Sequence, residues 1–539
     1  MALPWWVGLP VRWPVPRLLV RLAVRVRLPV DLPVSLERDS DAICLTPGRR
    51  VIPRTLLLRT AVVAIAALCL GACERRPPNP LGVEDASLVL IVLDAGNAGH
   101  VGAYGYPVNT TPRIDALAKR GVLFERTYSQ AATTFPSVPS FLSGLYPQTI
   151  ARRVSDGSTA DKPTVKRIVR GLVDPDNPGR PRYLAEAFAD AGFKTAAFSE
   201  NPLVAGGIGL DIGFEEFQSH FQDDPPPKEA VRRTERLISE AQKWLGTVGD
   251  RPFFLYLHLL RPHAPYWPPE RILEEFRPPK YAGRLQPDEK VLRRLNRGLE
   301  HATPEELAYI VAHYDANYRY ADELVGRIED TLAELGLSNR TMIVVTADHG
   351  EAFNEHGQYM HHSTAYDEMI QVPLVFAPPA GATLGTGRIS EPVALIDLAP
   401  TVAELFGLEL PGVDGESLVA SLRSPTTAPK RRLLFTEAGD VVAVIDGKQK
   451  FILNRSAVPP YQNMAALYDL EKDPDERVNL VAENPETVRR LGGAAQRFLG
   501  TTPVDYRIQN AAKAFDPKIQ GQLEALGYID APEPEASPR

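Results

Sequence analysis

The sequence predicts an α/β protein, with a doubly wound sheet between helices and a smaller antiparallel subdomain at the C-terminal end. Three apolar runs predict central strands that are buried on both faces, and each run ends in polar residues. These runs are Ser87–Leu93, Phe253–Leu260 and Thr341–Thr346. Helical patterns separate them, and strands that alternate with helices are typical of a sheet covered on both faces.

Between the strands, apolar spacing of helical period and end signals predict three main helices. They cover Thr111–Arg120, Tyr183–Ala191 and Pro304–Leu335, and Gly336 closes the third. After about Pro425 the pattern changes to short strand-like pieces, which predict an antiparallel sheet. These pieces are Leu433–Glu437, Val441–Ile445 and Lys450–Leu453, with a hairpin turn at Asp446-Gly447.

Two segments rich in Pro, Gly and charged residues, 151–181 and 217–228, are expected to be loops. Loops carried by a rigid scaffold often form the walls of ligand pockets, so these segments are candidates for substrate contact. Their composition does not indicate which substrate they contact.

The first 73 residues predict a leader with a lipoprotein signal peptide. Arginines precede a short apolar run, Ala61–Leu70, and the sequence Leu-Gly-Ala-Cys ends at Cys73. The run is too short to span a bilayer, so we expect cleavage before Cys73 and lipidation of that residue. The predicted location is the bacterial cell envelope, with the protein anchored to the membrane through Cys73. An ordinary short membrane anchor is the alternative.

The expected organisation has five parts. Residues 1–73 form the leader, in which 1–48 are ascribed to a start codon placed too early, and residues 74–83 form a polar tether. Residues 84–424 form the α/β domain, 425–505 the C-terminal α+β subdomain, and 506–539 a C-terminal extension with a disordered tail.

Charge and cysteine content exclude some classes of function. The chain after residue 73 carries 50 basic and 63 acidic side chains, a net charge near −13 that disfavours nucleic acid as a partner. Small anionic esters remain compatible, because a bound metal ion dominates the field of its own site. All three cysteines, Cys44, Cys69 and Cys73, lie in the leader, which excludes disulfides and a catalytic thiol in the body.

Polar residues at the ends of the predicted strands indicate a metal centre. Asp94 follows the first strand, and Asp348-His349 follows the third. In open parallel sheets, ligands bind beyond the carboxyl ends of the strands. Carboxylate oxygen and imidazole nitrogen are ligands of Zn, Mn, Ca or Mg. Thr134, near a predicted helix start, adds a hydroxyl group beside free backbone N–H groups, which suits an anion.

Nine groups of motifs, in order along the chain, resemble the sulfatase family of the alkaline phosphatase superfamily. They are Leu90–Asp94, Gly102–Gly105, Thr111–Ala118, Thr134–Gly144, His263–Tyr266, Thr346–Glu351 with Glu355–Gly357, Val372–Leu374, Ile396–Thr401, and Leu467–Pro474 with Asn479-Leu480. The resemblance implies an alkaline-phosphatase-like fold, a bound divalent metal ion and the cleavage of sulfate or phosphate esters. The implied substrates are small-molecule, glycan or lipid esters.

The chain departs from the family pattern at the nucleophile and at one metal ligand. Sulfatases carry Cys-x-Pro-Ser-Arg, with the Cys oxidised to formylglycine, and here Thr134–Val138 occupies that frame. Threonine cannot yield the aldehyde, and Val138 replaces the charged arginine. Ala95 stands where sulfatases usually have a second Asp. These departures favour phosphodiesters or phosphonates over sulfate esters.

With Thr134 as nucleophile, the chain looks like the Thr-dependent phosphodiesterases and phosphoethanolamine transferases of the superfamily. The likeness implies four metal ligands: Asp94, Thr134, Asp348 and His349. It also implies His263 as the acid or oxyanion donor and His361 as a supporting catalytic residue, with a lesser role for His362. Two other functions stay open. One is phosphotransfer between envelope molecules, and the other is binding without catalysis, which Ala95 and Val138 would suit.

Four nearby polar residues are left without a catalytic role. Asp315 and Asp322 lie on the long predicted helix, where carboxylates are usually solvated. Ser137 is interpreted as a helix N-cap. Asn201 could line the cleft but is left out of the predicted site.

Overall fold

The chain divides into two units, Met1–Pro77 and Pro78–Arg539, and each is described by itself. The computed structural model describes residues 42–45, 50–53, 81–83, 85–155, 164–221, 227–278, 281, 283–361, 364–455 and 464–500. In the first unit, β1 (Ala42–Leu45) and β2 (Arg50–Pro53) pair in antiparallel fashion. Cys73 and the expected apolar run of the signal peptide lie outside the described residues.

The main sheet of the second unit has eight strands, in the order β14-β4-β13-β9-β3-β8-β6-β7. Their bounds are β3 Ser87–Leu93, β4 Val122–Phe124, β6 Lys194–Ser199, β7 Glu216–Ser219, β8 Phe253–Leu259, β9 Thr341–Ala347, β13 Leu374–Ala377 and β14 Gly387–Ile389. β13 is antiparallel to both of its neighbours, whereas β9, β3, β8, β6 and β7 pair in parallel. The three predicted central strands are confirmed, and they lie side by side.

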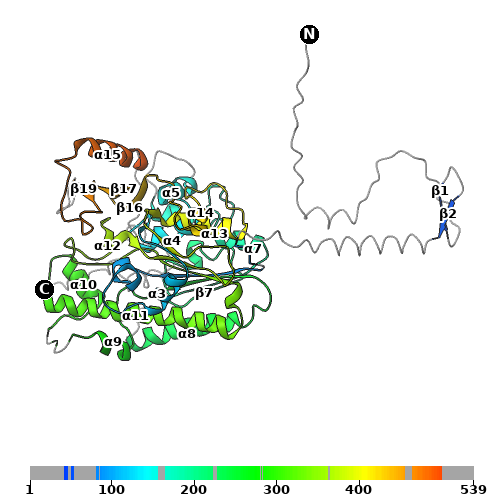
Figure 1. The fold of residues 1–539 in the computed structure, drawn as a ribbon, viewed down its shortest axis with the longest axis horizontal. Coiled ribbons are helices and arrows are strands. Elements are labelled where there is room, and N and C mark those ends of the chain that lie inside the picture. Colours follow the sequence, from blue (N-terminus) through cyan, green and yellow to red (C-terminus); the bar gives the residue numbers. More distant parts are fainter. Residues whose placement is uncertain are drawn as a thin grey trace, which may run out of the picture. The chain divides into compact units, whose positions relative to one another are not determined.

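Helices form a layer on each face of this sheet (Figure 1). One layer contains α3 (Pro112–Arg120), α8 (Pro227–Leu245) and α11 (Pro304–Glu334), and the other contains α4 (Thr134–Ser143), α7 (Leu184–Asp190) and α13 (Leu398–Phe406). Every residue of β3, β8 and β9 is buried, as continuous apolar strands between two helical layers should be. The predicted doubly wound class is confirmed. Among the described helices, none is both long and apolar enough to cross a membrane.

The C-terminal subdomain contains an antiparallel sheet in the order β16-β17-β18-β19. Its strands are β16 Leu434–Ala438, β17 Val441–Asp446, β18 Gln449–Asn454 and β19 Ala465–Asp469. α15 (Pro485–Leu499) packs on it through Leu491 and Leu499. The hairpin turn lies one residue later than expected, because Asp446 still pairs with Gln449. Gly447 therefore opens the turn, with φ 62°.

The expectation of loops over 151–181 and 217–228 is wrong in part. α5 (Pro147–Val154) and α6 (Val165–Val173) cover much of the first segment, while β7 and the start of α8 lie within the second. Both α5 and α6 bury one apolar side, which includes Ile150 and Ile168. The amphipathic stretch of each helix is short. Neighbouring Pro, Gly and charged residues therefore hid its helical spacing in the sequence.

Candidate metal centre and active site

The in-register ends of four neighbouring strands assemble the site. Leu93, the last residue of β3, pairs with Ala347 of β9 and with Leu259 of β8. Ser199, the last residue of β6, pairs with His258 of β8. Residues that follow these strands therefore leave the sheet at one edge, where parallel α/β sheets bind their ligands.

Asp94 and Asp348 meet at this edge, and both are fully buried. His349 Nε2 lies 3.5 Å from Asp348 Oδ2 and 3.7 Å from Asp94 Oδ1. His258 Nε2 lies 3.2 Å from Asp94 Oδ2 and 4.0 Å from Asp348 Oδ2. Asp94, His258 and Asp348 form a buried group whose ligand atoms lie within 4.8 Å of one another, close enough to hold one metal ion.

Thr134 is the first residue of α4, and its hydroxyl group faces the same edge of the sheet. Its Oγ1 lies 3.5 Å from Asp94 Oδ1 and 3.3 Å from His349 Nε2. Asn201 Nδ2 donates a hydrogen bond to Thr134 Oγ1 over 3.3 Å and another to Asp94 Oδ2. The structure thus brings together the four predicted ligands, while their roles stay predictions.

Backbone and hydroxyl donors hold Asp348 in place. Its Oδ1 accepts hydrogen bonds from the backbone N–H groups of Ala95 and His349, over 3.2 and 3.0 Å. Its carbonyl oxygen accepts from Ser129 Oγ and Ser137 Oγ, over 2.5 and 2.7 Å. Ser137 is therefore not the N-cap of α4, and Thr133 occupies that position.

Asp348 Oδ2 is the atom that best fits a bound cation. It is buried, and no described residue donates a hydrogen bond to it. A buried carboxylate oxygen without a donor costs free energy unless a positive charge compensates it. His349 Nδ1–H donates to Gly350 O over 3.0 Å, which leaves a lone pair on Nε2 beside both carboxylates. A divalent cation, when bound, would lower the pKa of a hydroxyl ligand and offset charge on the ester.

The two carboxyl groups of the site have opposite pKa shifts. Burial and the nearby charge of Asp94 raise the pKa of Asp348. Burial acts in the same direction on Asp94, but the charge of His263 and the hydrogen bond and charge of His258 lower its pKa to about 2. Although burial lowers the pKa of His258, the hydrogen bond to Asp94 gives a net rise. Positive charge on His258 and His263 therefore stabilises the Asp94 carboxylate.

His263 and His361, both predicted to act in catalysis, lie against this centre. The His361 ring centroid is 4.2 Å from that of His349 and 4.8 Å from that of His263. His263 Nδ1 donates to Ala264 O, and His361 Nδ1 lies 2.9 Å from Glu351 Oε1. Nδ1 of each ring is therefore engaged by the protein, which fixes the orientation of both rings. Burial lowers the pKa of His263. His362 lies outside the described residues.

Comparison with known proteins decides the family. The profile of the sulfatase family matches residues 86–408 of this chain. The chain belongs to the sulfatase family. It is 26% identical to human arylsulfatase A over 518 residues, an alignment that covers 84% of this chain and 88% of that protein. This family member is therefore a hydrolase of sulfuric or phosphoric esters.

Solved structures of other proteins share the fold. The phosphonate monoester hydrolase of Agrobacterium radiobacter superposes with a TM-score of 0.58 and 21% identity, over 77% of this chain and 95% of that one. A second structure, in complex with its substrate D-glucosamine-2-N,6-O-disulfate, gives a TM-score of 0.56 and 18% identity, over 77% and 97%. The alkaline-phosphatase-like fold implied by the motifs is confirmed.

Sequence reasoning missed His258 in this sulfatase-family site and left out Asn201. His258 interrupts the apolar strand β8, opposite Val92 of β3. A histidine within a run of buried apolar residues was the signal that could have found it, because burying its polar ring requires a partner. Asn201 comes two residues after β6, at the same edge of the sheet as Asp94, and only the strand order shows this.

The premise that Asp315 and Asp322 are solvated is wrong, because both side chains are buried. Asp322 accepts hydrogen bonds from the backbone N–H groups of Arg113 and Ile114, in the first turn of α3. Asp315 accepts one from Tyr106 Oη and lies 2.7 Å from His100 Nδ1. These carboxylates hold α11 against the segment 100–114 and do not belong to the Asp94 group.

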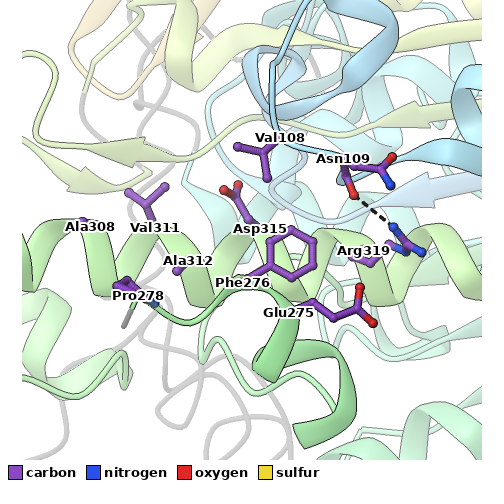
Figure 2. Close-up of a pocket in the computed structure, with 10 residues that line it drawn as sticks. All are labelled: Val108, Asn109, Glu275, Phe276, Pro278, Ala308, Val311, Ala312, Asp315 and Arg319. Carbon is purple, nitrogen blue, oxygen red and sulfur yellow. Dashed lines mark hydrogen bonds between the residues drawn. The ribbon is translucent and has the colours of Figure 1, made fainter. Parts of the chain in front are cut away.

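Asp315 also borders a cavity of about 410 Å³, which Figure 2 shows. α9 (Glu270–Phe276), α11 and the segment around Val108 form its walls. Arg319 closes one end, where its side chain donates to Asn109 O over 3.0 Å. None of the four predicted metal ligands is among the described residues that line this cavity, so it is separate from the site at the strand ends.

Proposed function

We propose that this protein is a metal-dependent hydrolase of phosphodiesters or phosphonate esters that uses Thr134 as its nucleophile. The position of Thr134 Oγ1 carries the proposal, because it lies 3.3 Å from His349 Nε2 and 3.5 Å from Asp94 Oδ1. This is the frame in which sulfatases carry formylglycine, and a threonine side chain cannot form that aldehyde. The attacking group must therefore be an ordinary hydroxyl.

In this proposal each residue of the site has a distinct role. Asp94, Thr134, Asp348 and His349 would hold the cation. His258, which lies in one buried group with Asp94 and Asp348, would support Asp94. The Thr134 hydroxyl, which Asn201 orients, loses its proton to water, and its oxygen attacks phosphorus in line with the leaving group. His263 gives a proton to the leaving oxygen as its bond to phosphorus breaks. A water molecule then attacks phosphorus and gives a proton back to His263, and the bond between phosphorus and the Thr134 oxygen breaks. His361 supports the rings of His263 and His349.

The replacement of formylglycine favours phosphorus over sulfur in this proposal. A hydrated aldehyde can release its bound group by expelling it from the same carbon, whereas an ester on Thr134 requires water to attack the central atom. A phosphonate monoester hydrolase is among the proteins with this fold, which supports phosphorus chemistry on such a scaffold. Val138 is fully buried in the apolar core. Because valine is uncharged, this position does not supply the positive charge that arginine gives in sulfatases.

We also propose that lipidated Cys73 anchors the enzyme in the bacterial cell envelope. The sequence Leu-Gly-Ala-Cys after an apolar run supports this location. A membrane anchor would place the active site near lipid or glycan esters. We expect the full chain to fractionate with membranes and the Cys73→Ser variant to fail to incorporate a radiolabelled fatty acid.

Turnover by the body of the protein, expressed from Glu74, tests the function. Bound metal is measured first, and aryl sulfates, phosphate monoesters, phosphodiesters and phosphonates are then screened. We expect Thr134→Ala to lose at least about a thousandfold in kcat. Thr134→Ser keeps a hydroxyl group and should retain part of the activity.

Thr133→Ala is the matched control for Thr134→Ala. The Thr133 hydroxyl donates to Phe135 O over 2.9 Å, so its loss should leave turnover nearly unchanged. Unchanged turnover in Thr134→Ala would refute the nucleophile, and turnover of aryl sulfates alone would refute the preference for phosphorus. Product that forms only when an acceptor alcohol is present would indicate the transferase instead.

A further inference from the structure

A buried lysine of the C-terminal sheet joins that sheet to the α/β domain. Lys450 of β18 is fully buried, and its Nζ lies 2.6 Å from Asp367 Oδ1 and 2.9 Å from Glu476 Oε1. Asp367 is the first residue of α12 (Asp367–Ile370), whereas Glu476 follows β19. Buried ion pairs rarely add much net stability, because desolvation offsets their attraction. The geometry that this cluster fixes is therefore a better account of its role than stability.

Glu476 contacts His356, at the start of the segment 356–361 that carries His361, and it also contacts Asp367. Its Oε2 accepts a hydrogen bond from the backbone N–H of Asp367 over 2.7 Å. Its carbonyl oxygen accepts one from His356 Nε2 over 3.2 Å, and Nδ1 of the same ring lies 2.8 Å from Glu368 Oε1. A single residue after β19 thus ties the start of this segment to the start of α12.

α12 lies directly against the residue that follows Asp348 and His349. The backbone N–H of Gly350 donates to Met369 O over 2.8 Å. A Cβ atom at Gly350 would lie 2.2 Å from Glu368 O, so only glycine permits this approach. The position of α12 therefore restricts the position of the Asp348-His349 segment.

The C-terminal end of α12 reaches Asp348 by a second route. Ile370 O accepts a hydrogen bond from the backbone N–H of Ser129 over 2.8 Å. Ser129 Oγ in turn donates to Asp348 O over 2.5 Å. Because α12 contacts the metal-binding segment through two separate sets of hydrogen bonds, a displacement of α12 would displace Asp348.

We propose that Lys450 and Glu476 are positioning residues for the candidate metal centre. They hold α12 and residues 356–361 and, through these, keep Asp348 and His349 in the geometry that binds a cation and His361 beside His349. Lys450 and Glu476 belong to the C-terminal subdomain, so that subdomain helps to position the residues of the site. The inference rests on the proposed metal centre but not on the identity of the ester.

Calorimetric titration with Mn²⁺ tests this inference. In Lys450→Met and Glu476→Ala, the Kd for Mn²⁺ should rise about tenfold or more, while the stoichiometry of the folded protein stays near that of the wild type. A purely structural role would lower the melting temperature or the stoichiometry and leave the Kd of the folded fraction unchanged. Glu476→Gln keeps an acceptor for the Asp367 N–H and should recover much of the affinity that Glu476→Ala loses.

Lys448→Met is the matched control. Lys448 lies on the same hairpin and forms an ion pair with Glu471, but both side chains are more than half exposed. Its removal takes away a lysine and an ion pair of the same sheet without touching α12. The Kd for Mn²⁺ should therefore stay within about twofold of the wild type.

Hydrogen exchange adds a measurement that needs neither metal nor substrate. In Lys450→Met, amides of 350–361 and 364–370 should exchange about tenfold faster or more, while those of β3 and β9 keep their protection. An unchanged Kd in both Lys450→Met and Glu476→Ala would overturn the inference, and so would a uniform loss of protection in β3 and β9. A wild-type protein that binds Mn²⁺ but cleaves none of the esters would remove the proposed function alone.

Discussion

Asn201 donates a hydrogen bond to Thr134, with its Nδ2 atom 3.3 Å from the Oγ1 of the proposed nucleophile. The same amide nitrogen donates to Asp94 Oδ2. On the other side of the amide, Oδ1 accepts from the backbone N–H of Leu203 over 2.7 Å. This third contact fixes which end of the amide faces the site, so Asn201 presents a donor to Asp94 and Thr134.

Replacing Asn201 should impair catalysis. Asn201→Ala removes the donor that orients the Thr134 hydroxyl, and we expect kcat to fall about a hundredfold. Asn201→Asp should lose more, because a second carboxylate would then face Asp94 at close range. Steady-state kinetics on the best ester from the screen measures both effects. An Asn201→Asp variant as active as the wild type would contradict this role.

His258 should contribute to metal affinity through its contact with Asp94. Its loss leaves Asp94 Oδ2 with one donor fewer, and we expect His258→Ala to weaken Mn²⁺ binding by about ten- to a hundredfold. Tyr256→Phe should weaken Mn²⁺ binding less than His258→Ala does, since it removes only the hydroxyl group that lies 2.9 Å from His258 Nδ1. Equal Mn²⁺ affinity in His258→Ala and the wild type would show that this imidazole has no part in the centre.

Removal of the metal should destabilise the fold. A ligand that binds only the folded state at a hundred times its Kd adds about 2.7 kcal/mol to the free energy of unfolding. We therefore expect a chelator to lower the melting temperature of the wild type. In Asp348→Asn the change should be much smaller, because this variant lacks one of the two buried carboxylates. A wild-type melting temperature that does not respond to chelation would argue against a tightly held ion.

The buried side chain of Arg261 should lower the free energy of unfolding of the protein. Its guanidinium is fully buried, and its three nitrogens have no hydrogen-bond partner among the described residues. Burial lowers the pKa of Arg261, although the charge of Glu200 opposes that shift. We expect Arg261→Met to raise the free energy of unfolding by about 1–3 kcal/mol. Urea denaturation measures this change.

Arg233→Met is the informative control for Arg261→Met. Arg233 Nε does donate to Glu200 Oε1, over 3.4 Å, and both side chains are buried. Its removal would leave the Glu200 charge without this partner, so we expect destabilisation. If Arg261→Met proved as damaging as Arg233→Met, the guanidinium of Arg261 would have to be well compensated.

Asp322 should make stability depend on pH. Burial raises its pKa to about 7, although the N–H groups of Ile114 and Arg113 lower it. A carboxyl group with a raised folded pKa stabilises the protein below its unfolded pKa and loses that contribution as pH rises from about 4 to about 7. Asp322→Asn is neutral throughout, so its stability relative to the wild type should improve by up to about 4 kcal/mol over this window. Urea unfolding at pH 4 and pH 7 checks it, and a constant difference would contradict the assignment.

The sequence predicted those parts of the fold that depend on local patterns. The strands that end before Asp94 and Asp348, and the long helix α11, follow from apolar runs and helical spacing. His258 and Asn201 could not be assigned in the same way, because their contacts depend on which strands are neighbours. The strand order β9-β3-β8-β6, which brings them to Asp94, is a property of the assembled sheet.

The buried carboxylates Asp315 and Asp322 show a second limit of sequence patterns. Helix periodicity indicates which face of α11 is apolar, but it does not show that another helix offers unsatisfied N–H groups to that face. Asp322 is buried because the first turn of α3 needs acceptors, and Asp315 because Tyr106 and His100 surround it. A polar residue on a helix can thus be a packing residue when its partner lies far away along the chain.

The strand register has a consequence for how the protein matures. Asp94 and Asp348 are separated by more than 250 residues, and they become neighbours only when β9 has paired with β3. A nascent chain in which β9 has not yet been synthesised also lacks Asp348, so its cation site is incomplete. Uptake of a cation at the proposed centre would therefore follow the pairing of β9 with β3, and it would report that these two strands have come together.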